Sequence, residues 1–308
     1  MAATSFKLNT GKEMPALGLG TWQSKPGEVQ AAVSYALKSG YKLVDCAYVY
    51  GNEDEVGKGL KEAFDAGVKR EDIYIMTKVW ASYNTRVEEC LDKSLKSLGV
   101  DYVDMYLIHW PVLMNPNGNN DKFPTLPNGE RDILRDWDHT EAWKQMEALP
   151  SSKVRGVGVS NYSKKYLEQL LAMSTITPAV NQIENHPSLP QQEIIDMCNA
   201  KGIHVVAYSP LGSTGSPLFT AEPVVKVAER KGVLPGTVLL SYHVARGTTV
   251  LAKSVTESRI KANMEIVKLD DEDMKLLNDY SDDLTKKGEL KRYVYPPFGI
   301  DFGFPDKS

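Results

Sequence analysis

Cysteine and long apolar runs are scarce in this chain, and both absences narrow what it can be. The 308 residues include 3 cysteines. They are far apart and form no Cys-x-x-Cys pair, so we expect free thiols in a reducing compartment, with the cytosol as the location. No stretch approaches the roughly 18 to 20 apolar residues of a membrane span, and the start, residues 1–7, lacks the apolar core of a secretory signal. We therefore expect no association with a membrane.

Metal-ligand and phosphate-loop motifs are also missing. The 5 histidines show no His-x-x-x-His or Cys/His ligand spacing, so we expect no metal centre. No Gly-x-Gly-x-x-Gly or Gly-Lys-Ser/Thr loop is present, which argues against a Rossmann site and a P-loop. The formal net charge of −4 gives no general attraction for nucleic acid. Any anionic ligand must be held by a local cluster of cations.

Short apolar runs alternate with helical patterns along the chain. Eight such runs end near Gly20, Asp45, Lys78, His109, Asn161, Gln182, Tyr208 and Lys253. Between them, apolar residues recur at i, i+3 and i+4, which predicts helices over 28–39, 84–98, 164–173 and 190–200. Strands alternating with helices in this way favour one closed (β/α)8 TIM barrel domain over residues 1–308, rather than two domains or an open doubly wound sheet. Residues 6–9 and 13–15 are predicted to form an N-terminal β-hairpin that plugs the lower end of the barrel.

Surplus length gathers in three segments that follow predicted strands. Residues 111–136 are rich in Asn, Pro and Gly, a second long segment follows Tyr208, and the third is the aromatic tail, residues 286–308. Long loops without secondary structure are uncommon in compact domains and are often functional. We expect these long loops and the C-terminal tail to wall a pocket over the C-terminal face of the barrel, where barrel enzymes carry their chemistry.

Four polar residues lie at or just past the ends of predicted strands: Asp45, Tyr50, Lys78 and His109. A tyrosine has an unperturbed pKa near 10 and holds its proton at neutral pH. A nearby Lys78 ammonium would lower the pKa of Tyr50, and Asp45 would keep that lysine charged and aimed, so the tyrosine becomes a general acid. His109 would orient a carbonyl oxygen beside it. The alternative is structural, with an Asp45–Lys78 ion pair, a packed Tyr50 and a His109 that caps a strand.

A second polar cluster lies in residues 251–263. Lys253 ends the strand, Ser254 begins a Ser-x-x-Glu capping pattern with Glu257, and Arg259 follows in the first helical turns. Backbone N–H groups at a helix start suit a phosphate when basic side chains accompany them. An ordinary capped helix with solvated basic residues is the alternative.

Amides and an aromatic ring end three further strands. The side chains of Asn161 and Gln182 could clamp a flat carboxamide, with Ser160 beside them, and Tyr208 could stack on a ring. Each is equally explained as a rim residue that satisfies backbone groups.

Taken in order, these segments resemble the motifs of the aldo-keto reductase superfamily over nearly the whole chain. They are Gly18-Leu-Gly-Thr-Trp22, Asp45-Cys-Ala-Tyr-Val-Tyr-Gly-Asn-Glu53, Thr77-Lys78, Leu107-Ile-His-Trp-Pro111, Gly158-Val-Ser-Asn161, Tyr208-Ser-Pro-Leu-Gly212 and Lys253-Ser-Val-Thr-Glu-Ser-Arg259. The resemblance implies a barrel that binds NADP(H) and reduces aldehydes or ketones to alcohols, or catalyses the reverse. The tail, residues 295–305, is similar to microbial glycerol dehydrogenases and glyceraldehyde reductases, which implies small polyol-type substrates such as glyceraldehyde or glycerol.

The resemblance also implies a role for each motif residue. Tyr50 resembles the proton donor, Lys78 and Asp45 its supporting pair, and His109 the residue that orients the carbonyl. The implied substrate contacts are Trp22, Tyr50, His109 and Trp110. The implied cofactor contacts are Gly20, Thr21, Trp22, Ser160, Asn161, Gln182, Tyr208, Ser209, Leu211, Ser213, Lys253, Ser254, Val255, Thr256, Arg259 and Asn263.

Three positions depart from the family pattern. Ala252 replaces a proline of the usual Ile-Pro-Lys-Ser run, and Ala262 stands where a glutamate commonly lies beside the adenine. Residues 213–217 lack an acidic latch over the cofactor, which implies faster cofactor release. Lys253 and Arg259 still favour a cofactor with a 2′-phosphate.

Two other functions would use the same residues. Lys78 could form a Schiff base as in an aldolase, although a lysine paired with Asp45 stays charged and non-nucleophilic. The chain could instead bind NADPH as a redox-sensing regulatory subunit. With all four catalytic-type residues intact, we expect an enzyme that acts as a monomer on a small-molecule carbonyl or alcohol substrate.

Overall fold

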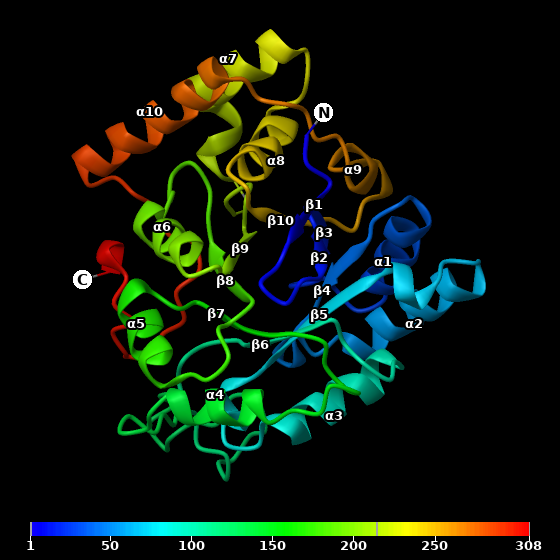
Figure 1. Cartoon of the computed structure of the whole chain (residues 1–308), viewed down its shortest axis with the longest axis vertical. Helices are drawn as coiled ribbons and strands as arrows, with labels where there is room; N and C mark the ends of the chain where they lie inside the picture. Colours follow the sequence, from blue (N-terminus) through cyan, green and yellow to red (C-terminus); the bar gives the residue numbers. More distant parts are fainter. Residues whose placement is uncertain (1, 214, 308) are drawn as a thin grey trace.

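The computed structural model describes residues 2–213 and 215–307, and its centre is a closed parallel β-barrel (Figure 1). The strand order around the barrel is β10-β3-β4-β5-β6-β7-β8-β9. The eight-stranded barrel that the apolar runs predict is confirmed. The largest difference at a strand end is in β8, which continues to Glu184 rather than ending at Gln182. The bounds are β3 Leu17–Gly20, β4 Leu43–Asp45, β5 Tyr74–Val79, β6 Met105–Ile108, β7 Val157–Ser160, β8 Val180–Glu184, β9 His204–Tyr208 and β10 Thr249–Lys253.

The α-helices surround this barrel (Figure 1). The predicted helix over 164–173 coincides with α5, whereas α3 begins at Val87 rather than at 84 because residues 81–83 form a separate 3-10 turn. Helix α6 begins at Gln192 because the preceding Gln191 has a left-handed backbone, with φ of 44°. The bounds are α1 Glu28–Lys38, α2 Glu53–Asp65, α3 Val87–Leu98, α4 Thr140–Glu147, α5 Lys164–Met173, α6 Gln192–Ala200, α7 Glu222–Lys231, α8 Pro235–Ala245, α9 Glu257–Ala262 and α10 Asp271–Lys287.

The N-terminal hairpin closes the lower end of the barrel, as predicted. Its strands are β1 (Ser5–Lys7) and β2 (Glu13–Pro15), paired antiparallel. Leu8 and Met14 are buried and pack in one apolar cluster with residues from inside the barrel. The hairpin therefore acts as a plug that removes the lower apolar layer from water.

Side-chain alternation stacks a polar layer on an apolar layer inside the barrel. The apolar layer includes Leu43, Met76, Leu107, Val180, Val206 and Leu251. Successive residues of a strand point to opposite faces, so residues two positions further along face the same interior. These residues are Asp45, Lys78, His109, Gln182, Tyr208 and Lys253. The fold thus collects the predicted polar residues at the C-terminal mouth of the barrel.

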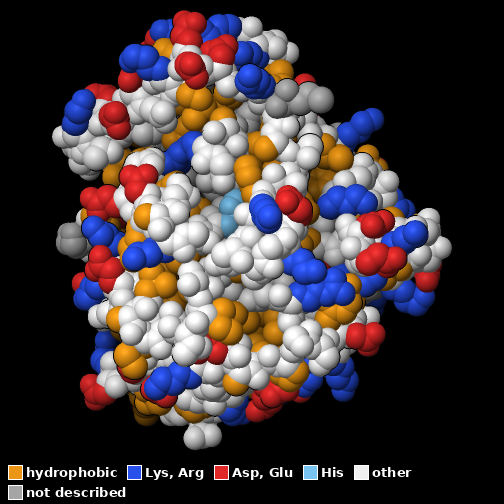
Figure 2. Space-filling model, viewed as in Figure 1, with side chains coloured by type: hydrophobic (Ala, Val, Ile, Leu, Met, Phe, Trp, Pro, Cys, Tyr) orange, Lys and Arg blue, Asp and Glu red, His pale blue; other side chains and the backbone are white. Residues whose placement is uncertain are grey.

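Acidic and basic side chains are mixed around the periphery of the face shown in Figure 2. This mixture agrees with the small net charge of −4. No helix in the described ranges is long and apolar enough to span a lipid bilayer. The three cysteines are buried and unpaired.

Candidate active site

A cavity of about 830 Å³ opens at the C-terminal mouth of the barrel. Tyr50 and His109 line it from the barrel side. The three long segments supply its outer walls: Phe123 from the first, residues 209–213 from the second and residues 293–298 (except 295) from the tail. The predicted pocket walled by the long loops and the tail is confirmed.

Lys78 lies at the centre of a buried polar group at the base of this cavity. Its side chain is 0% exposed, and its Nζ donates to Asp45 Oδ1 and to the Cys46 carbonyl oxygen, both at 2.7 Å. The third contact of Nζ is the Tyr50 hydroxyl at 3.3 Å. An ammonium has three donors, and two fixed acceptors here orient the third toward the phenol oxygen. Lys78 is therefore placed to stabilise negative charge that develops on Tyr50.

Burial raises the pKa of the Tyr50 phenol well above its usual value, and the negative charge of Asp45 raises it further. The predicted net lowering of the Tyr50 pKa is therefore wrong, although Lys78 Nζ lies 3.3 Å from the hydroxyl. The physical reason is desolvation, because a buried site stabilises a charged phenolate less than water does. The phenol keeps its proton at neutral pH and is available as a donor.

His109 is neutral in its position above β6. Burial lowers the pKa of its imidazole well below the usual value, and the Lys78 charge lowers it further. Its ring lies edge-on to Tyr50 and Trp80, with centroid distances of 5.7 and 5.3 Å. A neutral imidazole offers one N–H donor. His109 can therefore donate a hydrogen bond to an uncharged carbonyl oxygen beside Tyr50.

The strand-end amides are tied to this group by hydrogen bonds. Asn161 has a left-handed backbone, with φ of 63°, a conformation that asparagine tolerates better than most residues. Its Nδ2 donates to the His109 carbonyl oxygen at 2.9 Å, and its Oδ1 accepts from the Tyr208 hydroxyl at 2.8 Å. Gln182 Nε2 donates to Asp45 Oδ1 at 2.9 Å. The structure thus brings both amides and the Tyr208 ring next to the four catalytic candidates.

The other predicted cofactor contacts fall into two groups. Thr21 is buried beneath the cavity, where its hydroxyl donates to the Asp45 carbonyl oxygen at 2.8 Å, and Ser160 donates to the Gln182 carbonyl oxygen at 2.8 Å. The contacts that line the cavity are Gly20, Trp22, Ser209, Leu211, Ser213 and Lys253. Those outside the cavity lining, besides Thr21 and Ser160, are Ser254, Val255, Thr256, Arg259 and Asn263.

The predicted capping pair of Ser254 and Glu257 is wrong. The residue that precedes α9 is Thr256, and Ser254 Oγ instead accepts from the Thr256 backbone N–H at 3.1 Å. This turn connects the end of β10 at Lys253 to α9. Residues 213–217 can be described except Thr214, which lies outside the described residues.

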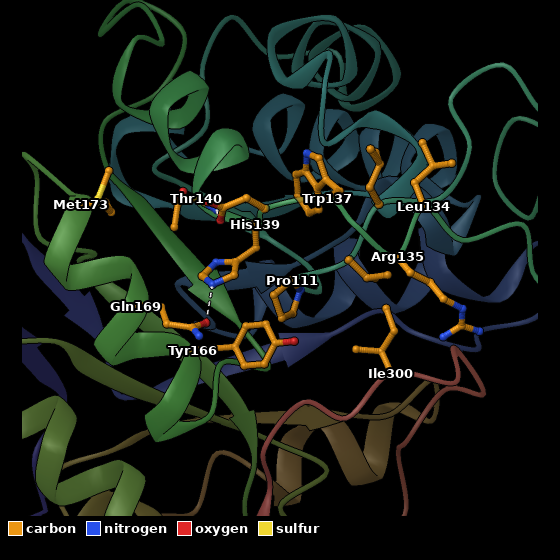
Figure 3. Close-up of a pocket in the computed structure, with 13 residues that line it drawn as sticks. Pro111, Leu134, Arg135, Trp137, His139, Thr140, Tyr166, Gln169, Met173 and Ile300 are labelled. Atoms are coloured by element: carbon orange, nitrogen blue, oxygen red, sulfur yellow. Dashed lines mark hydrogen bonds between the residues drawn. The ribbon is translucent and has the colours of Figure 1, made fainter.

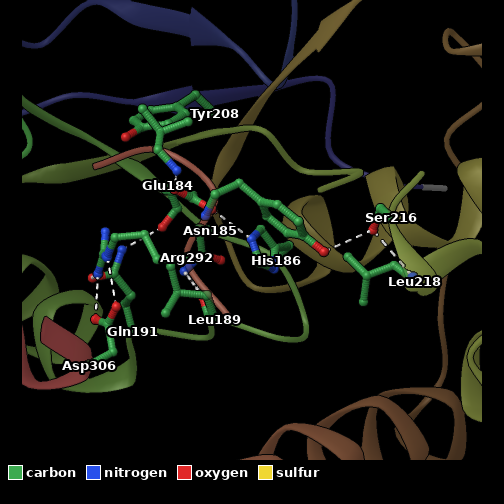
Figure 4. Close-up of polar contacts among 12 residues, drawn as sticks. Glu184, Asn185, His186, Leu189, Gln191, Tyr208, Ser216, Leu218, Arg292 and Asp306 are labelled. Atoms are coloured by element: carbon green, nitrogen blue, oxygen red, sulfur yellow. Dashed lines mark hydrogen bonds and ion pairs between the residues drawn. The ribbon is translucent and has the colours of Figure 1, made fainter. Parts of the chain in front are cut away.

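A buried network attaches the C-terminal tail to the barrel (Figure 4). Glu184, at the end of β8, is 0% exposed, and its carboxylate accepts from the backbone N–H groups of Tyr293 and Val294 at 2.7 and 2.8 Å. Arg292 donates to Gln191 Oε1 at 2.9 Å and, within the tail, twice to Asp306, at 2.7 and 2.8 Å. These charge-assisted bonds hold the tail in register with the cavity that it walls.

Residues 16–282 match the model of the Aldo/keto reductase family. The chain belongs to this family. It is 75% identical to a D-galacturonate reductase of Hypocrea jecorina over 100% of both chains. It is 46% identical to a glycerol 2-dehydrogenase (NADP(+)) of Saccharomyces cerevisiae over 96% of both chains. The solved structure of the aldose reductase from Schistosoma japonicum superposes with a TM-score of 0.86, at 38% identity and over 94% of both chains.

This aldo/keto reductase is thus an oxidoreductase, and its cavity fits the nicotinamide cofactors that the family uses. Lys253 and Arg259 are exposed and form no ion pair within residues 2–213 and 215–307, so two cations are available for a phosphate. The Asn161 and Gln182 side chains can hydrogen-bond a carboxamide, and the Tyr208 ring can stack on a flat heterocycle. Within the same ranges, no three His, Cys, Asp or Glu side chains cluster as metal ligands would.

Sequence reasoning missed several side chains that line the cavity of the reductase. Trp80 follows Lys78 by two positions, so the alternation of β5 extended by one residue would have placed it at the mouth. Phe123 and Arg131 lie in a segment without periodicity, and no sequence signal marks them. Of the predicted substrate contacts, Trp110 is buried against Phe298 with a centroid distance of 5.9 Å, whereas Trp22 is 43% exposed at the rim.

Proposed function

We propose that this reductase uses NADPH to reduce the aldehyde group of small polyhydroxylated substrates and catalyses the reverse oxidation of the alcohols. The observation that carries this proposal is the 3.3 Å contact between Lys78 Nζ and the Tyr50 hydroxyl at the base of the cavity. A protonated phenol supported by a fixed cation suits general acid catalysis at a carbonyl oxygen. NADPH, when bound, supplies the hydride for the carbonyl carbon.

The residues divide the remaining work among them. Tyr50 gives its proton to the carbonyl oxygen, and Lys78 stabilises the phenolate that remains. Neutral His109 donates a hydrogen bond that orients the oxygen. In the oxidation of an alcohol, Tyr50 must accept a proton. Because burial raises the pKa of Tyr50, we expect oxidation to become faster with rising pH.

The proposed cofactor contacts follow the polar groups of the mouth. Asn161 and Gln182 would hold the nicotinamide carboxamide, and the Tyr208 ring would lie against the nicotinamide. Lys253 and Arg259 would hold the 2′-phosphate, because both are exposed cations without an ion pair in the described part of the chain. The name of the 46% identical yeast relative includes NADP(+), which supports the phosphate-bearing cofactor.

D-Galacturonate and glyceraldehyde are the first substrates that we propose. The D-galacturonate reductase relative is 75% identical over the whole of both chains, so the pocket-forming loops and tail are included in the match. Relatives named for glycerol and D/L-glyceraldehyde are 46% and 45% identical. Both substrates present an aldehyde beside hydroxyl groups, and glycerol serves for the reverse direction.

Steady-state oxidation of NADPH by the purified chain tests the proposal. The panel is D-galacturonate, glyceraldehyde, aldopentoses, aromatic aldehydes and ketoesters, each with NADPH and with NADH. The Tyr50→Phe variant should lose roughly 10²- to 10⁴-fold in kcat. Its affinity for NADPH, measured by fluorescence titration, should match that of the wild type. Turnover of Tyr50→Phe near the wild-type rate would contradict the proposal.

The same assays separate the two rival functions. A Schiff-base aldolase would be trapped covalently at Lys78 by borohydride in the presence of a carbonyl substrate. A redox-sensing regulator would bind NADPH but turn over none of the panel. We also propose that the reductase works as a monomer in the cytosol. The three cysteines are free, as is usual for proteins of a reducing compartment.

A further inference from the structure

The charged side chains that line the cavity are Asp45, Arg131 and Lys253. Asp45 is neutralised by its ion pair with Lys78 at 2.7 Å. Arg131 and Lys253 form no ion pair within the described ranges. The cavity therefore carries two unpaired positive charges, although the chain as a whole has a net charge of −4. A cavity with this balance favours a ligand with anionic groups at two places.

The two cations belong to different parts of the cavity. Lys253 ends β10 and is paired in register with Gly20, among the proposed cofactor contacts. Arg131 belongs to the aromatic wall that begins at His109. The ring centroid of Trp80 lies 5.3 Å from that of His109, and the ring centroid of Phe123 lies 5.6 Å from that of Trp80. The Arg131 guanidinium carbon lies 4.6 Å from the centroid of the Phe123 ring. The anion that Arg131 would hold is therefore a group of the substrate.

The segment that carries Arg131 is fixed to the barrel. The hydroxyl groups of Tyr48 and Tyr83 both donate to the Asp121 carboxylate, and Ser82 Oγ donates to the Asp121 carbonyl oxygen at 2.6 Å. Trp80 Nε1 donates to the Lys122 carbonyl oxygen. Four hydrogen bonds at two adjacent residues hold this segment immediately before Phe123. The antiparallel bridge between Thr125 and Arg131 links this fixed backbone to the residue that stacks on Phe123, so the guanidinium is positioned before a substrate binds.

The stacked guanidinium has most of its donors free. Within the described residues, Arg131 makes one side-chain hydrogen bond, from Nη1 to the Phe123 carbonyl oxygen at 3.4 Å. A guanidinium has five N–H donors in a planar fork, and this fork matches the two oxygens of a carboxylate. A phosphate is commonly held by several donors, including backbone N–H groups. The single stacked guanidinium of Arg131 therefore matches a carboxylate better than a phosphate.

We infer that Arg131 is a specificity-determining residue that binds the carboxylate of an aldehyde acid, with sugar acids such as hexuronates as the substrate class. The inference rests on the proposed reductase function and adds the group that selects among aldehydes. The open-chain aldehyde enters beside Tyr50 and His109, and its carboxylate pairs with Arg131. Hydride adds to the aldehyde carbon and the Tyr50 proton to its oxygen, so the acid is reduced at one end and unchanged at the other.

The test compares D-galacturonate with its uncharged methyl ester, using wild type, Arg131→Gln and Arg131→Lys. A charge-assisted bidentate pair corresponds to roughly 10- to 100-fold in kcat/KM for the acid over the ester. Arg131→Gln should abolish this preference through a higher KM, with kcat largely retained. Arg131→Lys, which keeps the charge but loses the fork, should show an intermediate preference. Glyceraldehyde has no carboxylate, so its kcat/KM in each variant measures any general effect of the substitution on the pocket.

Arg135→Gln is the matched control. Arg135 lies on the same segment, but it lines a separate cavity of about 480 Å³ and donates to the Gly299 carbonyl oxygen (Figure 3). Arg135→Gln should leave the ratio of kcat/KM for the acid to kcat/KM for the ester unchanged. An unchanged ratio in Arg131→Gln, or an equal loss in Arg135→Gln, would overturn the inference while the reductase function stands. Failure of the wild type to oxidise NADPH with any aldehyde would instead overturn the proposed function.

Discussion

Replacing Lys78 with methionine separates the structural from the catalytic role of the buried ion pair. Met is close to lysine in length but carries no charge, so the substitution leaves Asp45 as a buried anion. Among the described residues, the Gln182 side chain still donates to the Asp45 carboxylate, at 2.9 Å. Removing one partner of a buried pair costs about 3–5 kcal/mol of folding stability, because the other charge is left uncompensated. We expect Lys78→Met to lose a stability of this size.

The catalytic loss should be separate from this loss of stability. Without the ammonium 3.3 Å from its hydroxyl, Tyr50 must form a phenolate that no cation stabilises. We expect kcat to fall by roughly 10²- to 10⁴-fold, the range for a disabled general acid. NADPH affinity should change little, since Lys78 is not among the proposed cofactor contacts.

The double variant Asp45→Asn/Lys78→Met is the matched control. It removes both charges, so it should regain most of the lost stability without regaining activity. Stability is measured by urea unfolding followed by tryptophan fluorescence, and activity by NADPH oxidation with glyceraldehyde. If the double variant regained activity together with stability, the pair would be purely structural and the catalytic reasoning would be refuted.

Two further predictions concern parts of the fold outside the catalytic group. Burial lowers the pKa of His204 to about 4. Below about pH 6.5 the unfolded chain therefore binds a proton at this histidine that the folded chain does not. The folding stability should fall as the pH drops from 6.5 to 4, by up to about 1.4 kcal/mol per pH unit. Urea unfolding at pH 6.5, 5.5 and 4.5 should show a shallower fall for His204→Gln, and an identical slope would contradict the assignment. Glu184→Gln places an amide NH₂ against one of the two tail N–H groups that Glu184 accepts, so we expect a loss of about 1–3 kcal/mol. KM should rise for D-galacturonate and glyceraldehyde alike, and a change confined to the acid would argue against a role in positioning the tail.

Much of the fold could be predicted from local patterns. The alternation that places Asp45 two residues after Leu43 and Lys78 two residues after Met76 marks strands whose ends are polar and whose interiors are apolar. Helix ends were less predictable. Ser254 and Glu257 have the spacing of a capping pair, yet the turn after β10 uses Ser254 to hold Thr256 instead. A capping pattern describes what neighbours could do, and the path of the chain decides whether they do it.

The sequence by itself determined the barrel, the family and the four catalytic candidates, because these depend on periodicities and motifs within short stretches. Tertiary structure decided the electrostatics and the pocket. The pKa of Tyr50 rises because the phenol is buried, and burial is a property of the assembled site. Arg131 meets the aromatic wall because Asp121 ties its loop to tyrosines far away in the sequence. Long-range contacts of this kind leave no periodic signal, so the choice of substrate had to be inferred from the folded chain.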